Sequence, residues 1–241
     1  MRTRQEIKAI GKRQFKANYW PCVGAIVLVM VVIGLISGIA NGPSATAAMN
    51  AAMTGSEPEV STTVSTGSTI GSLALIIISG PLEIGLCYFF VMNVLGRADS
   101  ISVTTPFTAA FTNFGRKLGG YLWMVLFSFL WSLLFIIPGI IKGFSYAMTP
   151  YILADCPNVA AKDALKLSMR IMKGHKWELF VFELSFIGWG ILSVLTLGIL
   201  DVFFVQPYMQ SSLATYYLEV REQALRTGVI TMGQLEGSEA V

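Results

Sequence analysis

The sequence is poor in charged residues, histidine and cysteine, and each shortage excludes a class of protein. Asp, Glu, Lys and Arg make up 13% of the 241 residues, whereas hydrophobic residues make up 54%. Soluble domains carry roughly 25% charged residues. With one histidine and three cysteines, the chain gives no support for a Ser-His-Asp triad, a disulfide framework or a zinc site. We therefore predict an integral membrane protein with no metal and no cofactor.

Several sequence motifs are also absent. The chain has no Gly-rich phosphate loop, no HExxH and no CxxC. No motif therefore supports nucleotide-dependent or zinc-dependent chemistry. The net charge of +3 is too small to indicate nucleic-acid binding. Residues 41–69 contain no Lys, Arg or Cys and are rich in Gly, Ser, Thr and Ala. This segment is expected to be an external, poorly ordered loop.

Apolar segments provide six candidate membrane spans. The segment from Leu118 to Ile141 contains no charged residue or histidine, as only a transmembrane or deeply buried helix would. The fourth span is shorter than the usual twenty residues or so and carries Lys142 and Pro150, so it either crosses with a tilt or re-enters, after an outer turn at Pro138–Gly139. The predicted spans are about 21–40, 70–95, 118–137, 140–154, 177–197 and 199–218.

The distribution of positive charge sets the orientation. With six spans, all of the 17 Lys and Arg except Lys142 lie on the cytoplasmic side. The predicted fold class is therefore all-α: a polytopic membrane protein with six transmembrane helices and three interfacial amphipathic helices. We expect one membrane domain at 1–227, both termini in the cytoplasm, and a disordered tail at 228–241.

The three amphipathic segments precede spans one, three and five, at about 4–19, 106–114 and 159–173. Thr3 and Glu6 form a capping-box pattern at the first, and Thr105 and Asn158 are the expected N-caps of the other two. Cations follow one face of the first and third helices and are candidates for contact with anionic headgroups: Lys8, Lys12, Arg13, Lys16, Lys162, Lys166, Arg170 and Lys173. The alternative is a merely solvated charged face.

Four ionisable residues fall at membrane depth, where each is costly and is a functional candidate: Glu83, Lys142, Glu183 and Asp201. Lys142 and Asp201 open spans on the same side and either pair across the bundle or never meet. Glu183 is expected to reach water or a basic partner. Glu83 lies near the middle of span two, beside Pro81, and is either a protonated structural residue or a proton- or cation-handling site.

Four short motifs occur in order: GPLEIG at 80–85, IIPGIIK at 136–142, PYILAD at 150–155 and KGHKWELF at 173–180. Together they resemble an uncharacterised bacterial membrane family, domain of unknown function nine-seven-five, over nearly the whole chain. More distantly, the Pro-Gly turn followed by a basic helix is similar to the membrane domain attached to some glycerophosphodiester phosphodiesterases. The resemblance implies a six-span bacterial inner-membrane protein without an assigned activity, so it supplies no functional residues.

Three functions are compatible with these features. The first is a non-enzymatic membrane component whose basic cytoplasmic helices bind anionic lipid or a protein partner, including another copy of itself. The second is a small transporter or channel that uses Glu83. The third is an intramembrane lipid enzyme, against which the lack of an acid-base cluster argues. The sequence favours the first.

Overall fold

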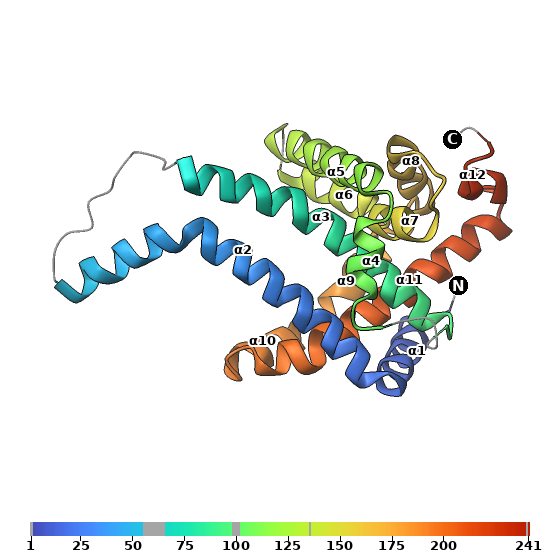
Figure 1. The fold of residues 1–241 in the computed structure, drawn as a ribbon. Helices are drawn as coiled ribbons and strands as arrows, with labels where there is room; N and C mark the ends of the chain where they lie inside the picture. Colours follow the sequence, from blue (N-terminus) through green and yellow to red (C-terminus); the bar gives the residue numbers. More distant parts are fainter. Residues whose placement is uncertain (1, 55–65, 98–101, 135, 240) are drawn as a thin grey trace.

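A computed structural model describes residues 2–54, 66–97, 102–134, 136–239 and 241, and all regular secondary structure among them is helical. The chain order is shown in Figure 1. The helices are α1 (Arg4–Ala17), α2 (Tyr19–Thr54), α3 (Thr66–Val94), α4 (Thr105–Phe111), α5 (Phe114–Leu134), α6 (Ile136–Tyr146), α7 (Thr149–Asp155), α8 (Ala161–Ile171), α9 (Lys176–Leu184), α10 (Ile187–Leu195), the π-helix η2 (Asp201–Val205), α11 (Gln206–Arg226) and α12 (Met232–Glu236).

Three segments of the described chain are long and apolar enough to cross a membrane. They are Tyr19–Gly38 in α2, Ala74–Val94 in α3, and Lys176–Leu195. The third is divided into α9 and α10 by a turn at residues 185–186. The predicted all-α fold is confirmed, and helices of this length and apolarity indicate a membrane protein.

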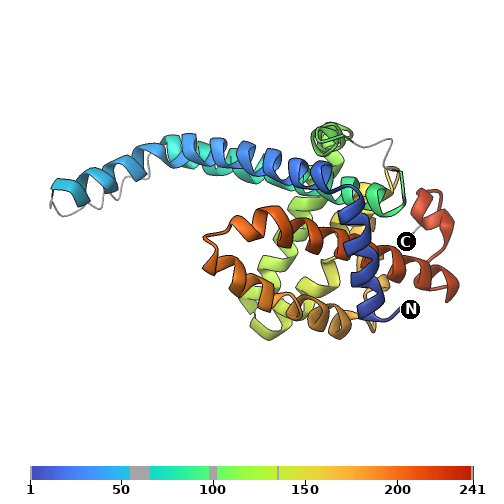
Figure 2. The same ribbon diagram turned by 90° about the horizontal axis from the view of Figure 1, so that it is seen from below.

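The helices are arranged as hairpins that extend from one end of the molecule. Both termini lie at that end, and the α2–α3 hairpin reaches farthest from it (Figures 1 and 2). The hairpin of α10 with η2 points the same way in both views. Helices α1 and α11 pack together at the end that carries the termini. The fold therefore separates a compact end from a set of projecting apolar helices.

Aromatic residues of α3, α9 and α11 form the core of the compact end. Phe89, Phe90, Phe182, Tyr216 and Tyr217 are all fully buried. Their rings meet edge to face or tilted, with 5.2 Å between the centroids of Phe89 and Phe90 and 5.4 Å between those of Phe182 and Tyr216. Such pairs add to the stability gained from burial alone. This core joins helices that are far apart in the sequence.

Glycines of α3 allow neighbouring helices to approach closely. A Cβ at Gly80 would lie 2.3 Å from the ring of Tyr121, and one at Gly85 would lie 2.0 Å from the carbonyl oxygen of Pro106. Both distances are far below van der Waals contact. Pro81 lies inside α3, between these two contacts. The GPLEIG segment is thus a crossing point for α4 and α5.

The hairpin of α5 and α6 differs from the prediction in the position of its turn. Pro138 and Gly139 lie in the first turn of α6, not in a turn between helices. Proline is tolerated there because the first N–H groups of a helix have no partner within it. Gly139 lets α6 approach α5, since a Cβ at this position would lie 2.7 Å from the Ser132 hydroxyl. The predicted outer turn at Pro138–Gly139 is therefore wrong.

The predicted fourth span, 140–154, is divided between two helices. The chain leaves α6 after Tyr146, and α7 begins at Thr149 with Pro150 in its first turn. Pro150 disfavours helical geometry in the residue before it and has no N–H to continue α6. All of α7 from Thr149 to Ala154 is buried. This segment is an interrupted helix within the bundle.

The predicted loop at 41–69 is also largely helical where it is described. Helix α2 continues to Thr54, and α3 begins at Thr66. Residues 44–53 are rich in alanine, the residue with the highest helix propensity. The rest of the predicted loop, 55–65, lies outside the described residues. At 36 residues, α2 is about 54 Å long, more than a bilayer core requires.

Two of the three expected N-caps are wrong. Thr3 and Glu6 form the predicted capping box at α1. Helix α4 is preceded by Thr104 instead of Thr105, and α8 by Ala160 instead of Asn158, in both cases without a side-chain cap. The chain turns after α4 at Asn113, which has a φ of 53°, and Gly115 lies inside α5.

The last predicted span and the tail also differ from expectation. The π-helix η2 ends at Val205, and α11 begins at Gln206 with Pro207 in its first turn. Pro207 has no N–H to donate to the carbonyl four residues earlier. Helix α11 runs to Arg226, past the predicted end at 218. The tail at 228–241 was expected to be disordered. Instead Thr231 forms a capping box that starts α12, and Ile230 and Leu235 are buried in the core.

Candidate functional site

A groove lies between α5, the end of α6 and α8, and we call it the α5–α8 groove. It has a volume of about 310 Å³. Its wall is mostly apolar and aromatic, and two lysines of α8 complete it. The residues that line it are Trp123, Phe127, Tyr146, Lys162, Leu165, Lys166 and Met169. The groove thus combines an apolar surface with two cations, the pattern of a site for an amphiphilic anion.

The aromatic wall and the lysines are in direct contact. Trp123 and Phe127 are stacked, with 5.4 Å between their ring centroids. The ammonium of Lys162 lies 5.0 Å from the centroid of the Trp123 ring, within cation-π range. Lys166 pairs with Asp163 of the same helix, at 2.9 Å between Nζ and Oδ1. Because Lys166 is half exposed, this ion pair is weak and can exchange for another anion.

Helix α8 is fixed by its apolar face. Ala164, Leu165, Leu167 and Ile171 are buried, at the spacing of an amphipathic helix. The buried Ser168 hydroxyl donates a hydrogen bond of 2.8 Å to the carbonyl of Ser145, next to Tyr146. Gly174, with a φ of 93°, turns the chain after the helix. The basic face of α8 is thereby held at a fixed distance from α5 and α6.

The four predicted cations of α8 fall into two pairs. Lys162 and Lys166 line the groove, whereas Arg170 and Lys173 do not. Arg170 and Lys173 are exposed; Arg170 lies in the last turn of α8, and Lys173 follows the helix. From the sequence, all four cations are predicted to lie on one face of a single helix. The structure therefore supplies a comparison that the sequence cannot, between cations that line a cavity and cations that do not.

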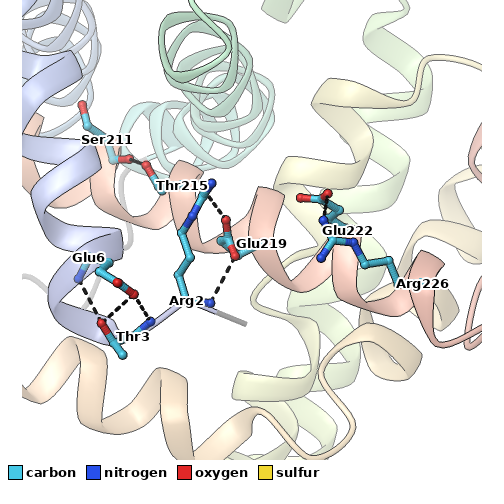
Figure 3. Close-up of polar contacts among 8 residues, drawn as sticks. All are labelled: Arg2, Thr3, Glu6, Ser211, Thr215, Glu219, Glu222 and Arg226. Carbon is cyan, nitrogen blue, oxygen red and sulfur yellow. Dashed lines mark hydrogen bonds and ion pairs between the residues drawn. The ribbon is translucent and has the colours of Figure 1, made fainter.

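Helix α1 presents its cations differently, because its apolar face is covered by protein. Ile7 and Phe15 are buried, and a Cβ at Gly11 would lie 2.7 Å from the backbone of Ser212 on α11. Arg2, just before α1, pairs with Glu219 of α11 at 2.6 Å (Figure 3). Figure 3 also shows the Thr3–Glu6 capping box that begins α1. Helix α1 is thus a packed element of the bundle on this face.

The cations of α1 do not share one environment. Lys12, Arg13 and Lys16 are exposed and remain candidates for contact with headgroups. Lys8 turns toward α9, with its ammonium 4.1 Å from the centroid of the Phe186 ring. Burial lowers the pKa of Lys8. Lys8 therefore contributes to packing between α1 and the α9–α10 turn.

Lys142 and Asp201 do not pair. The ammonium of Lys142 lies 4.7 Å from the centroid of the Trp131 ring on α5, and Asp201 begins η2. The second alternative from the sequence, two residues that never meet, describes their positions. Glu183 is exposed on α9.

Glu83 lines a second groove, which we call the Glu83 groove. It has a volume of about 470 Å³ and lies between α3, α5 and the α6–α7 break. The other residues that line it are Met124, Val125, Ser128, Phe129, Ser132, Gly143, Tyr146, Ala147 and Pro150. Tyr146 also lines the α5–α8 groove, so the two cavities are neighbours.

A polar junction at the end of α7 is absent from the sequence predictions. Asp155 accepts a hydrogen bond of 3.0 Å from the Tyr217 hydroxyl and forms an ion pair with Arg221. The Arg116 guanidinium donates to the carbonyls of Leu153, at 2.5 Å, and of Cys156, at 3.2 Å. It therefore satisfies carbonyls at the C-terminus of α7 that the helix leaves without partners. The junction ties α5, α7 and α11 together.

A cavity of about 390 Å³ adjoins this junction. Arg116, Lys117 and Asp155 line it. Lys117 is almost fully buried and donates to the carbonyl of Ala109, at the end of α4. Burial, with a contribution from the Arg116 charge, lowers the pKa of Lys117 to about 8. Burial likewise raises the pKa of the Cys156 thiol to about 11.

The sequence contains a weak signal for this junction. Asp155 ends the PYILAD motif, and Arg116 and Lys117 follow an aromatic helix directly. Their proximity depends on the turns around α7, which local patterns do not predict. Among the described residues, no group of three or more His, Cys, Asp or Glu is placed to hold a metal ion.

The fold and the grooves define a class: an all-helical membrane protein with amphiphilic cavities between its helices. Residues 133–224 match the model of a family described as protein of unknown function (DUF975). The resemblance to that family is confirmed over these residues. No curated protein and no solved structure matches the chain. The matched segment contains α8 and Asp155 but not Glu83 or Trp123.

Proposed function

We propose that the protein is a non-enzymatic component of the bacterial inner membrane that binds anionic phospholipid in the α5–α8 groove. The observation that carries the proposal is the joining of an aromatic wall to Lys162 and Lys166 in one cavity. The phosphate of the lipid would lie between the two ammonium groups. One acyl chain would lie along Trp123 and Phe127.

The proposal includes six spans with both termini in the cytoplasm. Its support is the distribution of Lys and Arg along the sequence, together with the two termini lying at one end of the molecule (Figures 1 and 2). Helices α5 and α6 and the segment from η2 through α11 would add three crossings to the three apolar spans. In this orientation α8 lies at the cytoplasmic boundary, where anionic headgroups are found.

The electrostatics favour selection by headgroup more than by acyl chain. An acyl chain leaves one apolar environment for another when it enters the groove, so it gains little free energy from burial. Each lysine near an anionic surface contributes about 1 kcal/mol. Two lysines therefore give about 2 kcal/mol, which corresponds to a preference of roughly 30-fold for an anionic over a zwitterionic lipid.

The test compares two double variants that remove the same charge, one within α8 and one at its C-terminal end. In Lys162→Gln/Lys166→Gln the groove loses both cations, whereas Arg170→Gln/Lys173→Gln leaves the groove intact. Native mass spectrometry of each protein, titrated with phosphatidylglycerol and phosphatidylcholine in mild detergent, gives the ratio of the two affinities. We expect the first variant to lose most of the roughly 30-fold preference and the second to lose less than about threefold.

Two outcomes would contradict the proposal. Equal losses in the two variants would mean that diffuse surface charge, and not the groove, selects the lipid. An unchanged preference in both would mean that the basic face of α8 is only solvated.

A further inference from the structure

Glu83 occupies an unusual position for a carboxyl group. It lies near the middle of the span Ala74–Val94, about 15 Å from either end at 1.5 Å per residue. Its side chain is exposed at the surface of the bundle and faces the Glu83 groove. A carboxylate at such depth is costly unless it has a partner or loses its charge.

No hydrogen bond or ion pair to the Glu83 carboxyl is found among the described residues, and no other charged residue lines the groove. The remaining polar groups of the groove are hydroxyls. The Ser132 hydroxyl is already used, since it donates to the carbonyl of Ser128 at 2.9 Å. The protein therefore leaves a single acidic group without a partner in a cavity large enough for a small ligand.

The rest of the groove is suited to a hydrophobic molecule. Val125 and Phe129 form part of its wall and are 42% and 61% exposed, so the groove opens onto the outer surface of α5. That surface is apolar, with Leu122, Leu126 and Leu130 also exposed. A surface of this composition faces lipid in a membrane protein. A ligand would thus enter from the bilayer.

We propose that the Glu83 groove binds a lipophilic cation, meaning a hydrophobic molecule that carries one positive charge. The Glu83 carboxylate neutralises the charge, and the apolar wall with Phe129 holds the hydrophobic body. An anion is disfavoured because the only charged group in the groove is acidic. This site is separate from the proposed phospholipid site, which uses cations on α8, so either proposal can fail without the other.

The test uses tetraphenylphosphonium as the cation and triphenylphosphine oxide as a neutral molecule of similar shape. Binding to the purified full-length protein in detergent micelles is measured by equilibrium dialysis. We expect Glu83→Gln to weaken binding of the cation by at least about tenfold, as loss of a charge partner in an apolar site should. Binding of the neutral molecule should not depend on residue 83.

Three controls make the result specific. Glu183→Gln removes one carboxylate from an exposed position on α9, outside the groove, and should leave binding unchanged. Glu83→Asp retains the charge and should retain measurable binding. Ser128→Leu fills the groove without a change of charge and should weaken binding of both molecules, while its unfolding temperature reports whether the fold is intact.

The proposal fails if wild type and Glu83→Gln bind tetraphenylphosphonium equally. It also fails if the wild type does not bind the cation above the level of the neutral molecule, since Glu83 would then be an uncharged acid within the bilayer. Equal weakening in Glu83→Gln and Glu183→Gln would assign the effect to net charge and would likewise exclude the site.

Discussion

Replacement of Asp155 tests whether the polar junction holds the compact end together. The Asp155 side chain is 9% exposed and that of its partner Arg221 is 26% exposed. Asp155→Ala would leave the Arg221 charge partly buried without a partner, and the Tyr217 hydroxyl without its acceptor. Breaking a buried pair costs about 3 to 5 kcal/mol. We expect the lower end, about 3 kcal/mol, because Arg221 still reaches water.

The assay is equilibrium unfolding in mixed detergent micelles, read by tryptophan fluorescence. The double variant Asp155→Ala/Arg221→Met removes the unpaired charge as well, so it should be about 2 kcal/mol more stable than the sum of the two single variants predicts. The control is Glu222→Ala on the same helix. Glu222 and Arg226 form an exposed pair (Figure 3), which contributes at most about 1 kcal/mol.

This reasoning would be refuted by two results. If Asp155→Ala costs no more than Glu222→Ala, the buried pair does not stabilise the fold. If the double variant shows simple additivity, Asp155 and Arg221 act independently, and the ion pair between them has no energetic role.

Three further predictions concern packing, pH and orientation. Gly85→Ala places a methyl group against the backbone of α4 and should destabilise by about 1 to 3 kcal/mol, whereas Gly119→Ala, which meets nothing within 4 Å, should not. Because burial lowers the Lys117 pKa to about 8 from 10.5, the unfolded chain binds that proton more tightly; stability should rise from pH 8 to 10.5, and less so in Lys117→Met. In a cysteine-free background, an impermeant thiol reagent outside intact cells should label Ser61→Cys but not Glu236→Cys; the reverse would overturn the orientation.

Periodicity and composition are enough to predict most of the helices. The capping box of α1 is a local pattern and is found as predicted, and α8 buries Ala164, Leu165, Leu167 and Ile171. Small residues in apolar helices favour close approach of a neighbouring helix, and Gly80 and Gly85 make such contacts. These features depend on residues that are neighbours along the chain.

The errors have a common physical origin in tertiary contacts. Pro138 reads as a turn but lies in the first turn of a helix, where Gly139 packs on Ser132. The composition of residues 228–241 predicts a disordered tail, whereas Ile230 and Leu235 are buried in the core. Local helix propensity predicts neither the packing of Gly139 on α5 nor the burial of Ile230 and Leu235, because each depends on contact with another helix.

The candidate sites could be predicted only in part. The sequence identifies Glu83 as a candidate because it is ionisable within an apolar span, and the lysines of α8 because they follow one face of a predicted amphipathic helix. It does not separate Lys162 and Lys166 from Arg170 and Lys173, since only the position of α5 makes one pair line a groove. The contact between Lys162 and Trp123 joins two helices that no short motif connects.

The most direct measurement for the central proposal is photo-crosslinking with an anionic phospholipid that carries a diazirine on its acyl chain. The protein is labelled in bilayers and digested, and the modified peptides are mapped by mass spectrometry. We expect the label on peptides that contain Trp123, Phe127, Leu165 or Met169, and its loss in Lys162→Gln/Lys166→Gln. Labelling spread evenly over all exposed apolar helices, unchanged in that variant, would contradict a specific lipid site in the α5–α8 groove.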